Sequence, residues 1–174
     1  DLAKPDALTE DVLTHALKEI RDDLGIEPEL ICVMFCNVAT TTSLLLEKAI
    51  QILRKDKSKK LDSVFSVAEF NMFAPMRARK INNNGLINPY VDIDYFKGGV
   101  SSIRDDNEDC YFADFAVQVC RPRCFDNIED GMPPVKWMGK QSYALKTDYG
   151  FDIDKDWQFP AIEYWLKNNG FTDK

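Results

Sequence analysis

A continuous apolar run between two amphipathic patterns is the feature that most restricts the fold. Residues 30–36 read LICVMFC, with no charged side chain among them. An apolar run without polar alternation is typical of a strand buried on both faces, as in the middle of a parallel sheet. Such a strand needs helices over both faces of its sheet, so the run predicts an α/β architecture with three layers.

Two helical patterns flank this run. Residues 9–24 form the first, with Thr9 as the expected N-cap and Gly25 as the expected stop. A polar loop at 37–43 leads into the second, and lysines crowd the end of that helix. The apolar stripes that should face the core are Val12, Leu13, Ala16, Leu17, Ile20 and Leu24 in the first helix and Leu46, Ala49, Ile50 and Leu53 in the second.

Further strand patterns lie at 62–70, 111–120 and 143–145, and a closing helix at 156–169. The strand, helix and strand over 30–70 predict a right-handed crossover between parallel strands. Pro122 should end the strand at 111–120, and Gly170 should stop the closing helix. The side chains expected to point inward from that helix are Trp157, Ala161, Trp165 and Leu166.

The middle of the chain, residues 72–109, has no clear period. Asn82-Asn83-Asn84-Gly85 within it is a strong hairpin-turn signal. We therefore expect one α/β domain over residues 1–174, with three layers, a mostly parallel open sheet and an irregular insertion at 72–109.

Charge and composition restrict the partners. Lys and Arg total 22 against 29 Asp and Glu, a net charge of −7. This balance argues against a general binder of nucleic acid or of anionic membranes, because both need a basic surface. A small anionic substrate in a local basic pocket stays possible. No apolar run approaches the roughly 20 residues that span a bilayer, and the first residues do not read as a signal peptide, so we expect a cytoplasmic protein.

Cysteine and histidine offer little catalytic chemistry. The single histidine, His15, lies within a helix pattern, and none of the five cysteines forms a C-x-x-C pair. Zinc sites need four closely spaced Cys or His ligands, so we interpret the cysteines as reduced core residues. Catalysis would then depend on carboxylates, Lys, Arg or a metal ion.

Asp152 and Asp154 are the sharpest local feature. In an extended segment, side chains two positions apart share a face, with Cα atoms about 6.6 Å apart. Two carboxylates so placed repel each other unless a cation lies between them, and a divalent ion with oxygen ligands suits that position. The alternative is a turn or cap cluster in which Asp152, Asp154 and Asp156 bind the amides that begin the closing helix. Spacing alone favours the alternative.

Two further groups of residues are candidates for ligand contacts. The loop at 37–43 follows a buried strand and precedes a helix, and ligands gather at the carboxyl ends of strands in open parallel sheets. Thr42 or Ser43 in this loop should cap the helix. No glycine-rich phosphate loop is present. The cations that could clamp a carboxylate or phosphate, with surface solvation as the alternative for each, are Arg77, Arg79, Arg104, Arg121, Arg123, Lys136 and Lys140.

Taken in order, these segments resemble the acylneuraminate cytidylyltransferases, which make CMP-activated keto sugar acids. The resemblance covers nearly the whole chain and depends on the order of its segments. The matching stretches are Asp62-Ser63-Val64-Phe65-Ser66-Val67, Asn37-Val38-Ala39-Thr40, Tyr111-Phe112-Ala113-Asp114-Phe115, Arg121-Pro122-Arg123, Lys136-Trp137-Met138-Gly139-Lys140 and Gly150-Phe151-Asp152-Ile153-Asp154. Asp1-Leu2-Ala3-Lys4-Pro5 resembles the stretch before the family's third structural helix, so we expect the family's first strands and their CTP-binding loop to be absent.

The resemblance implies a function and a set of site residues. The anomeric hydroxyl of a keto sugar acid attacks the α-phosphorus of CTP and pyrophosphate leaves, with Mg²⁺ neutralising phosphate charge. By this match Asp152 and Asp154 hold the metal and Asn37 contacts the sugar acid. The arginines at 77, 79 and 104 bind its carboxylate or a partner subunit. The family's fold is Rossmann-like, of the nucleotide-diphospho-sugar transferase type. Its members commonly dimerise, and residues 72–109 suit the role of a dimerisation arm.

Two alternatives accompany this interpretation. The first is a non-catalytic α/β binding or assembly module, descended from the same family, that dimerises through residues 72–109. The second is a nucleotidyltransferase for another sugar, which would share the sheet and the acidic metal site.

Overall fold

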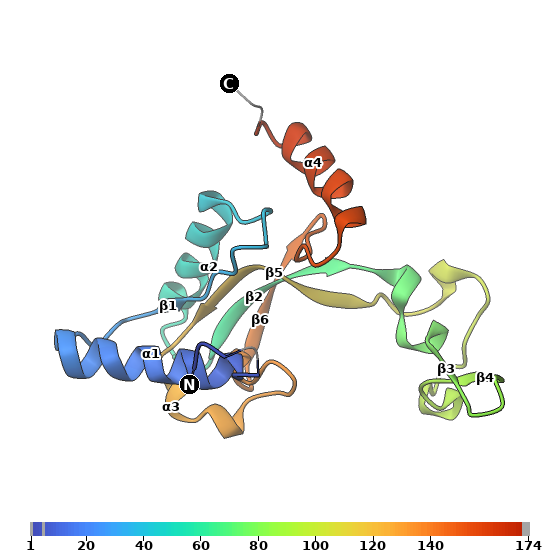
Figure 1. Cartoon of the computed structure of the whole chain (residues 1–174), viewed down its shortest axis with the longest axis horizontal. Coiled ribbons are helices and arrows are strands. Elements are labelled where there is room, and N and C mark those ends of the chain that lie inside the picture. Colours follow the sequence, from blue (N-terminus) through green and yellow to red (C-terminus); the bar gives the residue numbers. More distant parts are fainter. Residues whose placement is uncertain (1, 5, 172–174) are drawn as a thin grey trace.

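The computed structural model describes residues 2–4 and 6–171, which leaves Asp1 and Pro5 of the amino-terminal stretch outside the described residues. Figure 1 shows a twisted sheet with helices around it and an arm that projects to one side. The helices are α1 (Thr9–Leu24), α2 (Ser43–Lys55), α3 (Arg123–Asp126) and α4 (Phe159–Asn168). The strands are β1 (Ile31–Cys32), β2 (Ser63–Glu69), β3 (Arg79–Ile81), β4 (Ile87–Pro89), β5 (Tyr111–Cys120) and β6 (Ser142–Thr147).

The main sheet is mixed, with the strand order β1-β5-β2-β6. Strand β5 is antiparallel to both β1 and β2, whereas β6 is parallel to β2. Strands β1, β2 and β6 therefore run in one direction, and β5 lies between the two strands that α2 connects. An α/β class is thus confirmed, but the predicted mostly parallel pairing is wrong, because two of the three pairings in this sheet, both made by β5, are antiparallel.

The predicted central strand at 30–36 is wrong in position. Only Ile31–Cys32 is a regular strand, and it pairs with β5 alone among the described strands. Cys32 and Cys36 are exposed, and Met34 is 60% exposed. The cause is the insertion of β5, which takes the place beside β2 and leaves β1 at an edge.

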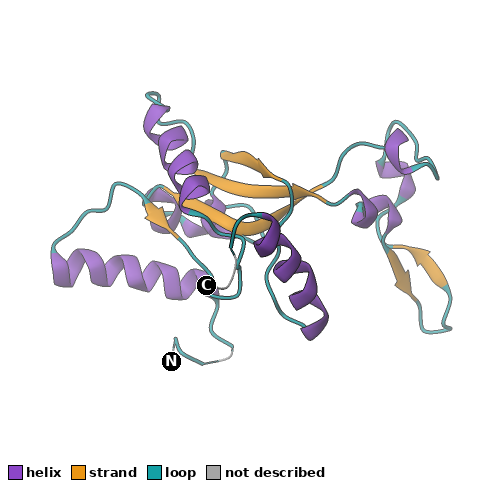
Figure 2. Ribbon diagram, turned by 90° about the horizontal axis from the view of Figure 1, so that it is seen from above, coloured by secondary structure: helices purple, strands orange, loops and turns teal. Residues whose placement is uncertain are grey.

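Helices pack on both faces of the sheet (Figure 2). Ala49 and Leu53 of α2 pack with Val64, Val117 and Val119 on one face. The other face carries α1 and α3, whose buried side chains Leu17, Cys124 and Phe125 pack with Phe65, Cys120 and Trp137. Neighbouring residues of β2 thus point into different cores, as the pleat of a strand requires.

The helix boundaries follow the sequence signals closely. Helix α1 spans the predicted residues and ends at Gly25, which has a φ of +63°. Its N-cap is Leu8 and not the expected Thr9, which lies one residue later as the first helical residue. Thr42 caps α2 as expected, because its side chain accepts a hydrogen bond from the Leu45 amide at 3.2 Å.

The closing helix begins later than the sequence pattern predicts. A 3₁₀ turn, η7 (Asp156–Gln158), precedes α4. Trp165 is buried as expected, but Trp157 is 73% exposed, which corrects the prediction that it points inward. Trp157 lies in the 3₁₀ turn and so falls outside the helical phase that aligns Ile162 with Trp165. Gly170 has a φ of +82° just after the helix.

Residues 72–109 form the arm, with the antiparallel strands β3 and β4 near its tip. The hairpin turn at 82–85 lies between them as predicted. The arm stands away from the sheet in two perpendicular views (Figures 1 and 2). It also contains short 3₁₀ turns at Pro75–Arg77, Ile93–Tyr95 and Arg104–Asp106.

A bulge in β5 interrupts its pairing with β2. Phe65 pairs with Gln118 but Val67 pairs with Ala113, so β5 has extra residues opposite Ser66. Phe115 within the bulge has a φ of +58°, which residues other than glycine rarely adopt. The Val117 amide donates to Ser66 Oγ at 2.7 Å, and Thr41 Oγ1 donates to the Ala116 carbonyl at 2.8 Å.

The carboxylate of Asp114 connects the strands at this bulge. Its Oδ1 accepts hydrogen bonds from Ser66 Oγ in β2 and from the Ala116 amide, and its Oδ2 accepts one from Thr147 Oγ1 in β6. Asp114 is 2% exposed, so water has little access to these donors and could not readily replace the carboxylate as their acceptor.

Replacing Asp114 with alanine should lower the free energy of unfolding by about 3 kcal/mol, because buried donors would lose their acceptor. Urea denaturation measures this change. Asp105→Ala is the matched control, since Asp105 is 84% exposed and its loss should change stability by less than about 0.5 kcal/mol. Equal stability of the two variants would contradict this role of Asp114.

Candidate functional site at the carboxyl ends of the strands

The carboxyl ends of the parallel strands bring two predicted segments together. The loop at 37–43 follows β1, and residues 148–155 follow β6. The Ile153 amide donates a hydrogen bond to the Asn37 carbonyl at 2.9 Å. Asn37 Nδ2 also lies 3.5 Å from the Ile153 carbonyl and 3.5 Å from Asp154 Oδ1. These contacts place Asn37 beside the D-x-D segment at the carboxyl ends of the strands.

Asp152 is half-buried and Asp154 is exposed, in a segment without regular secondary structure. Among the described residues, no group of three or more His, Cys, Asp and Glu side chains is arranged to hold a metal ion. Mg²⁺ in nucleotide enzymes commonly uses only one or two protein carboxylates and takes its other ligands from water and substrate phosphates. The hard oxygen donors of Asp152 and Asp154 fit that kind of site.

A cleft of about 470 Å³ opens close to this segment, at the same end of the sheet. Its floor contains the buried side chains of Thr40 and Asp114. Thr40 Oγ1 has no hydrogen-bond partner in the described structure, although Thr40 is only 2% exposed. A Cβ on Gly150 would lie 2.7 Å from Thr40 Oγ1, so the glycine is what allows the backbone to pass so close to this hydroxyl.

Two lysines and several aromatic rings surround the cleft. Lys146 donates a hydrogen bond to the Tyr111 hydroxyl at 2.7 Å, and this bond raises the pKa of Lys146 above its usual value. Lys48 projects from α2 into solvent at the cleft wall. Trp165 and Phe171 stack with ring centroids 6.0 Å apart on the opposite side. The lining thus combines two ammonium groups with the carboxylates of Asp114 and Asp148, hydroxyls and aromatic faces, a mixture that suits a polar ligand with an unsaturated or apolar part.

The arm arginines are not brought to this site within one chain. Arg77 donates to the Ser102 carbonyl, Arg79 to the carbonyls of Met76 and Ala78, and Arg104 to Asp105. All of these contacts lie within the arm. The roles of the three arginines, like those of Asn37, Asp152 and Asp154, stay predictions.

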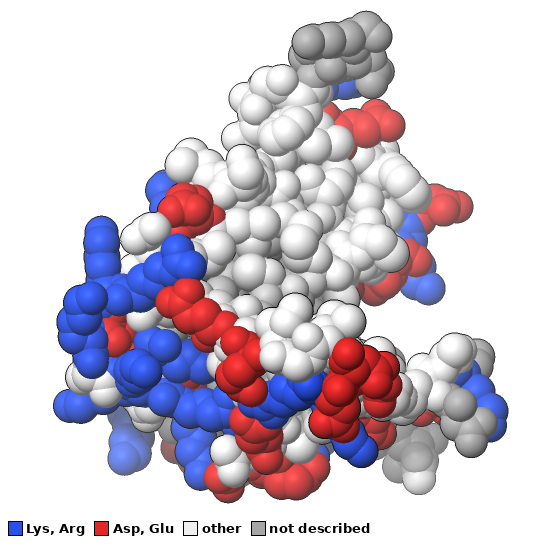
Figure 3. All heavy atoms as spheres, turned by 90° about the vertical axis from the view of Figure 1, so that its left-hand side faces the viewer, with Lys and Arg blue, Asp and Glu red and all other residues white. Residues whose placement is uncertain are grey.

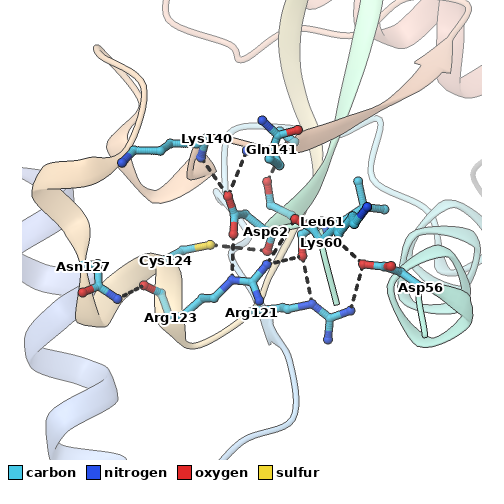
Figure 4. Close-up of polar contacts among 12 residues, drawn as sticks. Asp56, Lys60, Leu61, Asp62, Arg121, Arg123, Cys124, Asn127, Lys140 and Gln141 are labelled. Atoms are coloured by element: carbon cyan, nitrogen blue, oxygen red, sulfur yellow. Dashed lines mark hydrogen bonds and ion pairs between the residues drawn. The ribbon is translucent and has the colours of Figure 1, made fainter. Parts of the chain in front are cut away.

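Arg121, Arg123 and Lys140 lie at the opposite end of the sheet, where β2 and β6 begin (Figure 4). Arg121 donates to the carbonyls of Leu61 and Leu53, at 2.9 and 2.8 Å. Arg123 pairs with Asp62 at 2.7 Å. Lys136 pairs with Glu129 and Lys140 with Asp130. These contacts do not support the interpretation of the four cations as a substrate clamp.

Exposed cations gather at this end of the sheet, where β2 and β6 begin. The segment that ends α2 and leads to β2 carries exposed Arg54, Lys55, Lys57, Lys59 and Lys60. Figure 3 shows Lys and Arg side chains, with Asp and Glu side chains among them, in the lower part of the face it views, whereas the upper part is largely uncharged. The acidic segment of the candidate site therefore lies at the other end of the sheet from this group of exposed cations.

All five cysteines are free thiols. Cys120 and Cys124 are buried core residues as expected, but Cys32 and Cys36 are exposed, which corrects the core interpretation for those two. The exposure of Cys32 and Cys36 has the same cause as that of Met34, namely the edge position of β1.

Sequence comparisons add no family assignment. The chain matches no protein-family model, and no curated protein matches it. Over the part of the chain that the structure describes, no helix is both long enough and apolar enough to cross a membrane.

Sequence reasoning missed the cleft and one contact of the acidic segment. Thr40, Asp114, Lys146 and Gly150 were not identified as site residues. Asp114 had a readable signal, because it is the only charged residue within an otherwise apolar strand pattern. Gln158, whose side chain binds the D-x-D segment, had none, since glutamine at the start of a helix is ordinary.

Asp62 should make stability depend on pH. Partial burial alone would raise its pKa, but hydrogen bonds from the Gln141 and Lys140 amides and from Arg123 outweigh burial and hold the pKa of Asp62 below its usual value. A lowered native pKa stabilises the fold above the unfolded pKa of about 3.9 and loses that contribution as the pH falls through the native value.

We therefore expect Asp62→Asn to cost about 2 kcal/mol of unfolding free energy at pH 7, with the difference from wild type shrinking between about pH 5 and pH 2. Urea denaturation across this range measures it. Asp130→Asn, which removes an exposed ion pair, should cost less than about 1 kcal/mol at pH 7. If the difference in unfolding free energy between wild type and Asp62→Asn grew as the pH fell, the role given to Asp62 would be disproved.

Proposed function

We propose that the chain is a Mg²⁺-dependent nucleotidyltransferase of the acylneuraminate cytidylyltransferase type. It would join CMP from CTP to a keto sugar acid and release pyrophosphate. The observation that carries the proposal is the contact between Asn37 and the Asp152–Asp154 segment, two pieces far apart in sequence to which the resemblance gives site roles. The nearby cleft offers space for a substrate, with Lys48 and Lys146 in its lining beside the carboxylates of Asp114 and Asp148.

The side chains divide the work according to their chemistry. Asp152 and Asp154 would hold Mg²⁺, which supplies neutralisation of phosphate charge when bound. Lys48 and Lys146 would attract the anionic substrates into the cleft and orient them. The sugar acid's anomeric oxygen then forms its bond to the α-phosphorus as the bond to pyrophosphate breaks. Our proposal includes the Rossmann-like fold of this enzyme class and, because all five thiols are free, a reducing cytoplasmic setting.

Pyrophosphate release from CTP and Mg²⁺, assayed with a panel of eight- and nine-carbon keto acids, tests this function. We expect release with one acid, and loss of at least about a hundredfold in rate for Asp152→Ala and Asp154→Ala with the fold intact. Asp156→Ala, an exposed neighbour in the same acidic run, is the matched control and should keep its rate within about threefold. Unchanged turnover in the first two variants would refute the metal assignment.

The arm supports a homodimer as part of the proposal. It exposes an unusual number of large apolar side chains for a segment with so little core: Met72, Phe73, Ile81, Leu86, Ile87, Tyr90, Tyr95 and Ile103 are each more than 60% exposed. Exposed apolar groups of this extent mark association surfaces. A second copy covering the arm would also bring Arg77, Arg79 and Arg104 near a neighbouring chain.

Ile87→Lys should convert this dimer to a monomer, because burying an unpaired ammonium group at an apolar interface is costly. Sedimentation equilibrium measures the mass. Asn83→Lys, in the polar turn of the same hairpin, adds the same charge and should leave the dimer intact. A wild-type chain that is monomeric at all concentrations would rule the arm out as a dimer interface.

The same apolar arm favours a second candidate function, a non-catalytic assembly module of the same ancestry. That module would form a tight dimer and show no change in melting temperature with CTP and Mg²⁺. The two candidates separate cleanly, because a ligand that binds only the native state must raise its stability.

A further inference from the structure

Gln158 connects three backbone groups of the acidic segment. Its Oε1 accepts hydrogen bonds from the amides of Asp154 at 2.7 Å and Lys155 at 2.6 Å. Its Nε2 donates to the carbonyl of Asp152 at 3.0 Å. One carboxamide therefore binds the backbone on both sides of Ile153, and it needs both its acceptor and its donor to do so.

The segment is thus held from two directions. The Asn37 carbonyl, in the loop after β1, accepts a hydrogen bond from the Ile153 amide. Gln158, at the end of η7, binds the Asp152 carbonyl before Ile153 and the Asp154 amide after it. Four successive residues, 152–155, have a main-chain group fixed in this way without any regular secondary structure. Among the described residues neither the Asp152 nor the Asp154 carboxylate forms an ion pair, and the one side-chain contact of Asp154 is the 3.5 Å hydrogen bond from Asn37 Nδ2. Carboxylate oxygens on both residues are therefore open to a ligand while their backbone is fixed.

We infer that Gln158 is a positioning residue for the carboxylates of Asp152 and Asp154, setting the geometry in which they hold a divalent cation. This inference rests on the proposed function. Its physical basis is that a metal site binds tightly only when its ligands are already oriented, and groups that orient ligands typically change metal affinity ten- to a hundredfold. A glutamine that merely completed the capping box of η7 would stabilise that turn and leave metal affinity unchanged.

Titration with Mn²⁺, an oxygen-preferring ion that can be followed by water-proton relaxation, provides the test. Gln158→Met removes the donor and acceptor at nearly constant size, and we expect its Mn²⁺ affinity to fall at least about tenfold. The matched control is Asn168→Ala. It removes a 2.8 Å bond from a side-chain amide to the Tyr164 carbonyl in the same helix, and its affinity should stay within about twofold of wild type.

The outcomes separate the two proposals. If the wild-type chain binds Mn²⁺ and Asp152→Ala abolishes this binding, but a folded Gln158→Met variant binds Mn²⁺ as tightly as wild type, the role of Gln158 is overturned and the metal site stands. A wild-type chain that binds no Mn²⁺ overturns both. If Gln158→Met does not fold, amide hydrogen exchange on the wild type decides: the Asp154 and Lys155 amides should be protected, and exchange at the rate of an unstructured peptide overturns the inference.

Discussion

The buried carboxylate of Asp114 is the interaction on which the candidate site most depends. It accepts hydrogen bonds from β2, from the bulge of β5 itself and from the last residue of β6. Charged acceptors bind more strongly than neutral ones and are costly to leave unpaired in a core. Three strands are therefore held in one register where β6 ends and the chain turns toward the acidic segment.

This register determines how the site is built. Only three residues separate Thr147 from Phe151, so the position of β6 limits where Asp152 can lie. Gly150 passes against Thr40 and Asp114 at distances that leave no room for a side chain. The loop after β1 is fixed to the same bulge by Thr41 and to the acidic segment by Asn37. The cleft and the D-x-D segment are thus both positioned by the loop after β1 and the chain that follows β6.

Local signals in the sequence predicted local structure well. The periodicity of α1, the extent of β5 and the Asn-rich turn of the arm all depend on neighbouring residues, and all three predictions are confirmed. The place of residues 30–36 was wrong because it depends on β5, which arrives much later in the chain. The burial of Trp157 was wrong because a 3₁₀ turn shifted the helical phase.

The candidate site was only partly accessible to the same reasoning. Asn37, Asp152 and Asp154 could be named from strand order and resemblance, since ligands gather at carboxyl ends of strands. The pairing of Asp114 with Ser66 and Thr147 could not, because it requires the register of a bulge. The roles of Arg121 and Arg123 were equally hidden, since a guanidinium that binds carbonyls reads the same in sequence as one that binds phosphate.

The position of β5 between β1 and β2 also has a consequence for how the chain folds. Helix α2 can form early from local contacts, but the two strands that it connects have no direct pairing to close. The sheet can form only when β5, which follows the whole arm in sequence, pairs between β1 and β2. Contacts distant in sequence should therefore limit the folding rate. The length of the arm adds little to this delay, because doubling a flexible loop costs only about 0.6 kcal/mol of closure free energy.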